Sequence, residues 1–264
     1  MLRETLQKRL IGMNPDFRFR GQEPGRLENF SDACFALAIT LLLISTTPPT
    51  SFDQVRKFAW EIIPFFLCIT LIILIWHQHF VFFFRYGLRN SSVVVLNTLF
   101  IILVLFYVYP LKFLAKAILL PVTSLFGENA FHLELRAMYA GSNMGDLMII
   151  YGFGAMSIFL VLAVMYLYAL NHADELELNA IERFDTQSAM QSNFLMASVP
   201  FVSVVVALLF KGSFQVGFFA GITYFLYSPL MTIFWRIRNK KRKKIGPGST
   251  EPTVNEPSDL LQYP

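Results

Sequence analysis

The chain has 264 residues and a formal net charge of +4 at pH 7; 55% of its residues are hydrophobic, 16% are aromatic and 15% are charged. Soluble domains carry about 25% charged residues. This composition therefore excludes a disordered chain, a nucleic-acid-binding domain and a collagen-like fibre, and it argues against a soluble enzyme. Both cysteines, Cys34 and Cys68, lie in apolar stretches, which argues against a disulfide framework.

Residues 1–25 are expected to form a basic arm on the cytoplasmic side of a membrane. The segment is polar throughout, and its basic residues are Arg3, Lys8, Arg9, Arg18 and Arg20. It lacks the apolar stretch and small-residue cleavage site of a secretory signal peptide, so we expect no cleavable signal here.

Six apolar stretches follow the arm, and each approaches the roughly 20 residues that a helix needs to cross a bilayer. The first reaches this length only if its helix begins near Arg26. The third contains Pro110, which predicts a kink or an end of the helix at that point. The sequence thus predicts an all-α integral membrane protein with six transmembrane helices in residues 26–235. The expected spans are Phe30–Ile44, Trp60–Phe84, Val93–Leu120, Leu147–Leu170, Phe194–Phe210 and Phe214–Trp235.

The distribution of Lys and Arg predicts that both termini are cytoplasmic. Basic residues are dense in the N-terminal arm and after Trp235, and six spans would put these two segments on the same side. The acidic segment Asn171–Asn193 is expected to be an amphipathic or solvated cytoplasmic helix. Residues 236–264 are expected to be basic and then disordered, since Pro, Ser and Glu are frequent from Gly246 onward. We expect a multi-pass protein of the cell membrane, in contact with membrane lipid.

The first span has two different faces. At about 100° per residue, Leu37, Leu41 and Ile44 share an apolar face and Thr40 lies at its edge. Asp32 lies about 140° from Leu37, nearly on the opposite face. Because ionisable groups inside a membrane are costly, Asp32 marks either a function or a structural lock.

Other polar side chains are expected at the depth of Asp32. Trp76 and His79 lie near the inner end of the second span, and Asn97 lies near the inner start of the third. Indole, imidazole and amide groups can all donate to a carboxylate, so a hydrogen-bonded lock between three helices is the simplest interpretation. A proton relay through Asp32 and His79 is the alternative. A metal site from His77 and His79 is weaker, because side chains at i and i+2 point to different faces of a helix. We expect no metal or cofactor.

The segment Tyr151–Gly154 is similar to part of a carbonyl filter of a potassium channel. It continues an apolar span without a re-entrant loop, so close helix packing explains its glycines better. The chain has no phosphate-binding glycine loop, no HExxH motif and no arrangement of Ser, His and Asp with a plausible aqueous pocket. We therefore do not expect an enzyme.

The sequence Arg26-x-x-x-Phe30-Ser31-Asp32 at the inner start of the first span resembles the signature of the lysosomal/endosomal potassium channel family. The similarity is to the six-helix prokaryotic members of that family. It extends through the apolar run Phe35–Leu42 and includes further positions in the second and third spans, namely Trp76, His79, Asn97 and Pro110. The Pro-rich exit of the first span, Thr46–Thr50, departs from the family pattern.

The resemblance implies a cation channel with weak to moderate preference for potassium and without a carbonyl filter. A chain with one six-helix repeat is expected to form a homotetramer, with four first helices around the pore and potassium as the permeant ion. Leu37, Leu41 and Ile44 match pore-lining positions that would act as a hydrophobic gate, and Thr40 matches a position linked to selectivity. A structural polar network would hold the pore helix; its members are Arg26, Phe30, Ser31, Asp32, Trp76, His79 and Asn97.

The residues alone leave three alternatives open. These are a proton-coupled secondary transporter that uses Asp32 and His79, a membrane-embedded enzyme, and a non-conducting scaffold whose basic tail faces anionic lipid. Nucleic acid is not an expected partner.

Overall fold

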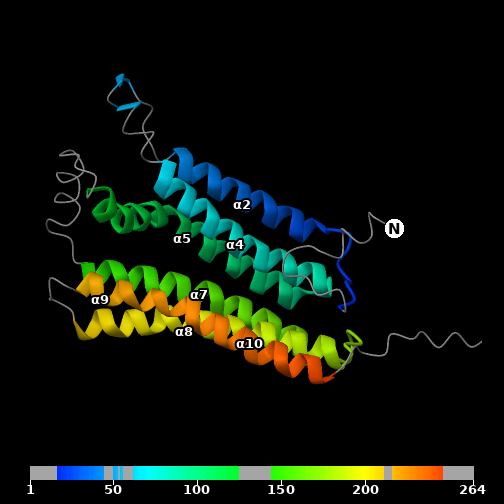
Figure 1. Cartoon of the computed structure of the whole chain (residues 1–264). Coiled ribbons are helices and arrows are strands. Elements are labelled where there is room, and N and C mark those ends of the chain that lie inside the picture. The colour runs from blue at the N-terminus through cyan, green and yellow to red at the C-terminus, as the bar shows by residue number, and fades with distance from the viewer. Residues whose placement is uncertain are drawn as a thin grey trace, which may run out of the picture.

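The computed structural model describes residues 17–44, 50–52, 54–55, 62–124, 144–210 and 216–245, and the regular structure within these ranges is entirely helical. The helices form two groups that lie side by side (Figure 1). The first group is α2 (Arg26–Ile44), α4 (Ile62–Tyr86) and α5 (Ser91–Ser124). The second is α7 (Met144–Asn171), α8 (Ala180–Leu209), α9 (Val216–Ile222), the 3-10 helix η1 (Thr223–Leu226) and α10 (Tyr227–Ile245). The predicted all-α fold is confirmed.

Four stretches of the described helices are long and apolar enough to cross a membrane: Ile62–Tyr86, Ser91–Val108, Gly145–Asn171 and Ala180–Leu209. A multi-pass membrane protein is therefore supported. The first predicted span does begin at Arg26, but α2 has only 19 residues and carries charges in its first two turns. The last predicted span is divided among α9, η1 and α10. The count of six spans stays a prediction.

Two helices continue through positions where the sequence suggested a boundary. Helix α5 does not end at Pro110 but runs to Ser124, close to the end of the expected span Val93–Leu120. A membrane helix tolerates proline because neighbouring helices and local adjustments satisfy the freed backbone groups. Helix α10 continues through the boundary expected after Trp235 and ends at Ile245, because Lys and Arg are good helix formers. The last residues, 246–264, lie outside the described ranges.

The acidic segment Asn171–Asn193 is not one amphipathic or solvated helix of its own but the end of α7, a turn and the start of α8, which corrects the prediction. Its second half is the beginning of α8, a single helix of 30 residues. Asn179 caps α8: its side chain accepts from the Glu182 backbone N–H at 2.8 Å, and the Glu182 carboxylate accepts from the Asn179 backbone N–H at 3.0 Å. This reciprocal capping box fixes where the helix starts.

Aromatic side chains join the two helix groups near the end of the molecule where α4 ends. The rings of Phe82 and Tyr166 meet edge to face with centroids 5.3 Å apart. The hydroxyl groups of Tyr86 and Thr186 lie 2.8 Å apart, within hydrogen-bond distance. These contacts connect α4 to both α7 and α8. Edge-to-face aromatic pairs are favourable beyond the area that they bury, so they hold the two groups in register.

Close helix packing, rather than a carbonyl filter, surrounds the glycines of α7. A Cβ atom on Gly152 would lie 2.3 Å from Val204 of α8, and one on Gly154 would lie 2.5 Å from Tyr107 of α5. Only glycine permits both neighbours to come so near. Small residues commonly allow such approach in membrane helices.

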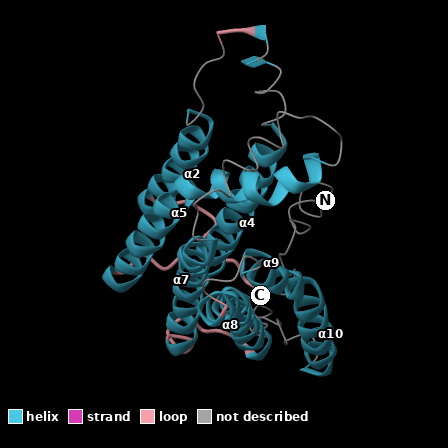
Figure 2. Ribbon diagram, turned by 90° about the vertical axis from the view of Figure 1, so that its left-hand side faces the viewer, coloured by secondary structure: helices cyan, strands magenta, loops and turns pink. Residues whose placement is uncertain are grey.

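The described chain begins and ends at the same end of the molecule (Figure 1). Residue 17, the start of α2, the end of α4 and the end of α10 all lie there. Viewed along the bundle, α10 lies at its edge, beyond α8 and away from α2 (Figure 2). This common end is the one that the sequence predicts to be cytoplasmic.

Candidate functional site

Helix α2 packs through one face only. Its buried residues follow helical spacing: Glu28, Ser31, Phe35, Ala38 and Leu42. Leu37 and Leu41 lie on the other side and keep 52% and 49% of their surface exposed in the single chain. The face that the sequence predicts to line a pore is therefore free of intramolecular packing where the structure describes it. Ile44 ends α2, and its side chain lies outside the described set.

Thr40 is exposed beside this apolar face. Its hydroxyl group donates to the backbone carbonyl of Ala36 at 2.9 Å, one turn earlier. A hydroxyl oxygen has one hydrogen and two acceptor lone pairs. Because the hydrogen is directed at the backbone, the oxygen presents its lone pairs outward.

A buried chain of hydrogen bonds ties α2 to α4 and α5. His79 Nε2 lies 2.6 Å from Asn97 Oδ1, Asn97 Nδ2 donates to Ser31 Oγ at 2.9 Å, and Ser31 Oγ donates to the Leu27 carbonyl at 2.9 Å. Since Asn97 Oδ1 can only accept, His79 Nε2 must carry the hydrogen. The chain of donors is thus directional and ends on the backbone of α2.

The His79 ring packs in a cluster with the aromatic rings of Phe35 and Phe100. It stacks on Phe100 with centroids 5.2 Å apart and an interplanar angle of 7°, and it lies 5.8 Å from Phe35. Only 1% of the residue is exposed. A buried ring fixed in this way keeps the orientation that its hydrogen bond to Asn97 needs.

Asp32 belongs to a second, separate link. The Trp76 indole Nε1 donates to Asp32 Oδ1 at 2.7 Å, and the Trp76 ring stacks on Phe80 with centroids 5.6 Å apart. A proton relay would have to connect Asp32 and His79. Their hydrogen-bond partners differ, however: Asp32 accepts from Trp76, and His79 bonds to Asn97. Ser31, Asp32, Trp76, His79 and Asn97 are brought together at one end of the bundle, as two links rather than one.

A cavity of about 210 Å³ lies between the start of α2 and the end of α4. Asp32, Trp76 and His79 contribute to its wall, together with Glu28 from the first turn of α2. Glu28 is also paired with Arg89, whose Nη2 lies 3.3 Å from Glu28 Oε2. Within the described residues, no group of three His, Cys, Asp or Glu side chains is placed to hold a metal ion.

Arg26 and Phe30, the other members of the predicted network, are exposed at the start of α2. Phe30 keeps 64% of its surface exposed. The residue therefore shares the outward side of α2 with Leu37 and Leu41 rather than the buried side with Ser31.

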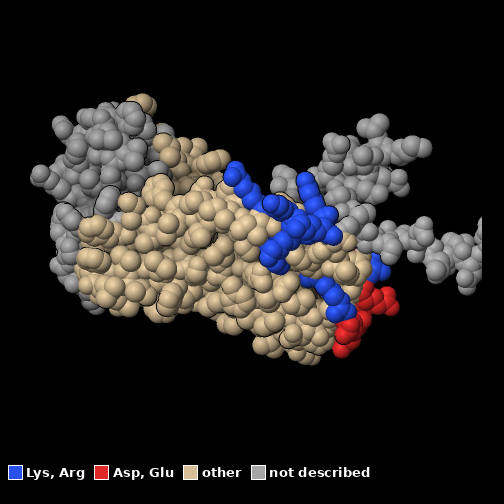
Figure 3. Space-filling view, turned by 60° about the horizontal axis from the view of Figure 1, so that its bottom comes forward, with Lys and Arg blue, Asp and Glu red and all other residues tan. Residues whose placement is uncertain are grey.

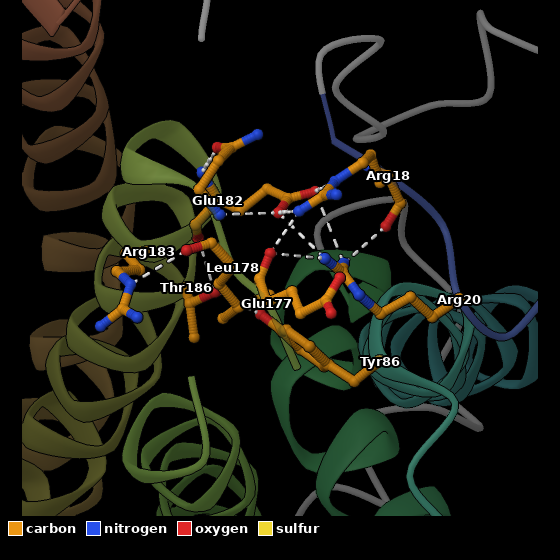
Figure 4. Close-up of polar contacts among 9 residues, drawn as sticks. Arg18, Arg20, Tyr86, Glu177, Leu178, Glu182, Arg183 and Thr186 are labelled. Atoms are coloured by element: carbon orange, nitrogen blue, oxygen red, sulfur yellow. Dashed lines mark hydrogen bonds and ion pairs between the residues drawn. The ribbon is translucent and has the colours of Figure 1, made fainter. Parts of the chain in front are cut away.

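The sequence reasoning missed a buried carboxylate, that of Glu182 at the start of α8 (Figure 4). Arg18 and Arg20 of the N-terminal arm both reach it: Arg18 Nη2 lies 3.2 Å and Arg20 Nη2 3.0 Å from Glu182 Oε2, and none of the Glu182 side chain is exposed. The Arg18 backbone N–H also donates to Glu182 Oε1 at 2.7 Å. The hydrogen bond that the Arg18 guanidinium donates to the Glu182 carboxylate raises the pKa of Arg18. We call these three side chains the arm clasp.

The arm reaches Glu182 by crossing the end of α4. The backbone N–H groups of Arg20 and Gly21 donate to the carbonyls of Arg85 and Phe84 at 3.3 and 3.1 Å. The signal for the clasp in the sequence was the capping pattern Asn179-x-x-Glu182, which marks the start of a helix. Nothing in the spacing of the residues linked it to two arginines more than 160 positions earlier.

Comparison with known proteins places this architecture in a family. Residues 26–107 match the family described as endosomal/lysosomal potassium channel TMEM175. These residues contain α2, α4 and both hydrogen-bonded links.

The chain is 43% identical over 237 residues to a protein of Marivirga tractuosa named "Potassium channel". The aligned region covers 89% of this chain and 96% of that protein. It is also 43% identical to the potassium channel MtTMEM175, which was crystallised as a threonine-to-alanine variant bound to a nanobody–MBP fusion. The two structures superpose with a TM-score of 0.78, over 87% of this chain and the whole of the other. A channel homologue from Chamaesiphon minutus gives 19% identity and a TM-score of 0.47 over 81% of this chain. With 43% identity over 89% of its length to a named potassium channel, and the family match over residues 26–107, the chain belongs to the endosomal/lysosomal potassium channel TMEM175 family.

Proposed function

We propose that this protein is a potassium-permeable cation channel in which four copies surround a central pore lined by α2. The observation that carries the proposal is that α2 has two different faces. One face packs within the chain, and on the other face the side chains of Leu37, Leu41 and Thr40 are exposed. The named relatives are potassium channels, which supports a channel rather than an enzyme or a coupled transporter.

The apolar face of α2 supplies the gate in this proposal. Four copies of Leu37, Leu41 and Ile44 would form three successive rings around the axis. A narrow apolar constriction expels water and blocks ions. Opening then requires the α2 helices to move apart until a partly hydrated ion fits.

Thr40 supplies the selectivity in this proposal. With its hydrogen committed to Ala36, each hydroxyl oxygen offers lone pairs that replace part of the hydration shell of a cation. Potassium gives up its water more easily than sodium does, so a ring of weak oxygen ligands favours potassium. No backbone carbonyl filter is required.

The orientation follows from the charge distribution. We place the multi-pass protein in the cell membrane with both termini in the cytoplasm, because Lys and Arg gather at the end of the molecule where the described chain begins and ends. The pore would then open to the cytoplasm at the start of α2.

The test is current recording from purified protein in a planar bilayer with potassium on one side and sodium on the other. We expect a reversal potential shifted toward that of potassium. Thr40→Ala should reduce this shift while current persists. Thr70→Ala is the matched control, because Thr70 of α4 is also exposed and makes the same bond to the carbonyl four residues earlier, at 2.9 Å; it should leave the shift unchanged.

An electrically silent protein that instead drives proton-dependent uptake into vesicles would contradict the channel proposal. Such a result, abolished by Asp32→Asn or His79→Gln, would favour the transporter alternative. Equal loss of selectivity in Thr40→Ala and Thr70→Ala would contradict the role given to Thr40.

A further inference from the structure

The rotation of α10 about its axis is fixed by two arginines that bind α8. Arg238 Nε donates to Ser188 Oγ at 2.8 Å, and its guanidinium lies 4.3 Å from the centre of the Phe184 ring. One turn later, Arg242 Nε donates to Asp185 Oδ1 at 2.9 Å. These contacts commit one side of the helix to the bundle.

The opposite side of α10 carries a row of exposed basic residues. At about 100° per residue, four of them fall within about 60° of the direction that points away from Arg238 and Arg242. These four, which we call the basic face, are Arg236, Lys240, Lys243 and Lys244, and all are exposed. Lys and Arg side chains gather near the end of α10 on the surface shown in Figure 3.

Three acidic side chains at this end of the bundle are bound to other arginines, while Glu175 and Glu177 are exposed in the turn after α7. Asp185 is paired with Arg242, Glu182 with the two arginines of the arm clasp, and Asp174 with Arg183. These three carboxylates therefore do not neutralise the basic face, which keeps its positive potential at the surface of the described bundle.

The same helix changes from apolar to basic along its length. Ile233 and Trp235 keep 55% and 42% of their surface exposed immediately before Arg236. Tryptophan is enriched where hydrocarbon meets the headgroup layer of a bilayer. From Arg236 to Lys244 the helix rises about 12 Å at 1.5 Å per residue, which is enough to pass through the headgroups of one leaflet.

We propose that the basic face of α10 binds the phosphate groups of anionic phospholipids in the surrounding leaflet. Lipid is the occupant that the geometry favours, because the exposed apolar side chains of Ile233 and Trp235 continue the same helix into the hydrocarbon. Juxtamembrane basic clusters are attracted to anionic headgroups. The inference depends on α10 lying at the membrane surface and is independent of ion conduction.

The test titrates the purified full chain in neutral detergent with short-chain phosphatidylglycerol and follows its melting temperature by tryptophan fluorescence. We expect a saturable rise that short-chain phosphatidylcholine does not produce. The variant with all four positions of the basic face changed to Gln should lose at least half of the rise. A variant that keeps the charges (Arg236→Lys, Lys240→Arg, Lys243→Arg and Lys244→Arg) should retain it.

An undiminished rise in the neutralised variant would overturn the proposal. So would an equal rise with glycerol phosphate or a short oligonucleotide, because the site would then bind a soluble anion and not lipid. A second measurement does not depend on folding of the variant: phosphatidylglycerol that co-purifies with the unmodified chain should fall at least twofold between 50 and 500 mM salt, about the range over which charge screening becomes strong. Retention that does not change with salt would also count against it.

Discussion

At the residue scale, the side chain of Asn97 links α2 to α4 through two hydrogen bonds. It accepts from His79 and donates to Ser31, and all three residues are buried. A buried network stabilises a structure when every member is satisfied, and it becomes costly when one member is lost.

We therefore expect Asn97→Leu to destabilise the protein by about 1–3 kcal/mol, the usual cost of leaving buried donors and acceptors without partners. Leucine has a similar size, so the loss is mainly one of hydrogen bonds. The measurement is the midpoint of unfolding in detergent by circular dichroism. Thr98→Ala, at an exposed position next in the chain, is the control and should change the midpoint little. Equal midpoints for both variants would show that the network adds no stability.

At the element scale, the N-terminal arm depends on a glycine. A Cβ atom at Gly21 would lie 2.1 Å from the backbone carbonyl oxygen of Phe83, and a backbone atom cannot move aside cheaply. The neighbouring Gly25 differs, because a Cβ there would meet the guanidinium end of the Arg89 side chain, which can swing away.

Gly21→Ala should lift the arm from the end of α4 and withdraw Arg20 from Glu182. A buried carboxylate that loses its partners costs about 3–5 kcal/mol, so the arm clasp should open as a unit. Limited trypsin digestion in detergent measures this directly, since cleavage after Arg18 and Arg20 should become faster. Gly25→Ala should digest like the unmodified protein. If both variants digest at the original rate, the close approach at Gly21 does not hold the arm.

The elements also show what the sequence can and cannot predict. The length and apolarity of each stretch predicted α4, α5 and α7 well, because burial in a membrane follows local composition. The start of α8 was predicted wrongly because composition counts the charge of Glu182 but not its distant partners Arg18 and Arg20. For the site, shared depth predicted that Asp32, Trp76, His79 and Asn97 come together. The division into two links depends on side-chain geometry, which spacing does not contain.

At the scale of the whole molecule, the two helix groups meet mainly where α5 packs on α7. Helix α2 lies at the margin of the first group and contacts α4 and α5. In a membrane, the unpacked apolar face of such a helix meets either lipid or a neighbouring subunit. The proposed tetramer provides such a partner surface for Leu37 and Leu41.

Native mass spectrometry of the detergent-solubilised chain should therefore find four copies per particle. Asp32→Ala should lower the fraction of tetramer, because it frees Trp76 and loosens α2 against α4. Thr40→Ala should leave that fraction unchanged, since its hydroxyl bonds only to its own helix. The same loss of tetramer in both variants would contradict this division of roles, and a monomer in the unmodified protein would contradict the pore proposal.

The arm clasp has a consequence for how the protein is made. Glu182 lies 164 positions after Arg18, so at 5–20 residues per second it is synthesised roughly 10–30 s later. During that interval the arm, with Arg18 and Arg20, is present without its partner Glu182 in α8. Trp76 and Asn97 emerge earlier and can engage α2 first. The order of translation thus assigns the early steps of assembly to the two links around Asp32 and Ser31, and the attachment of the arm to the last.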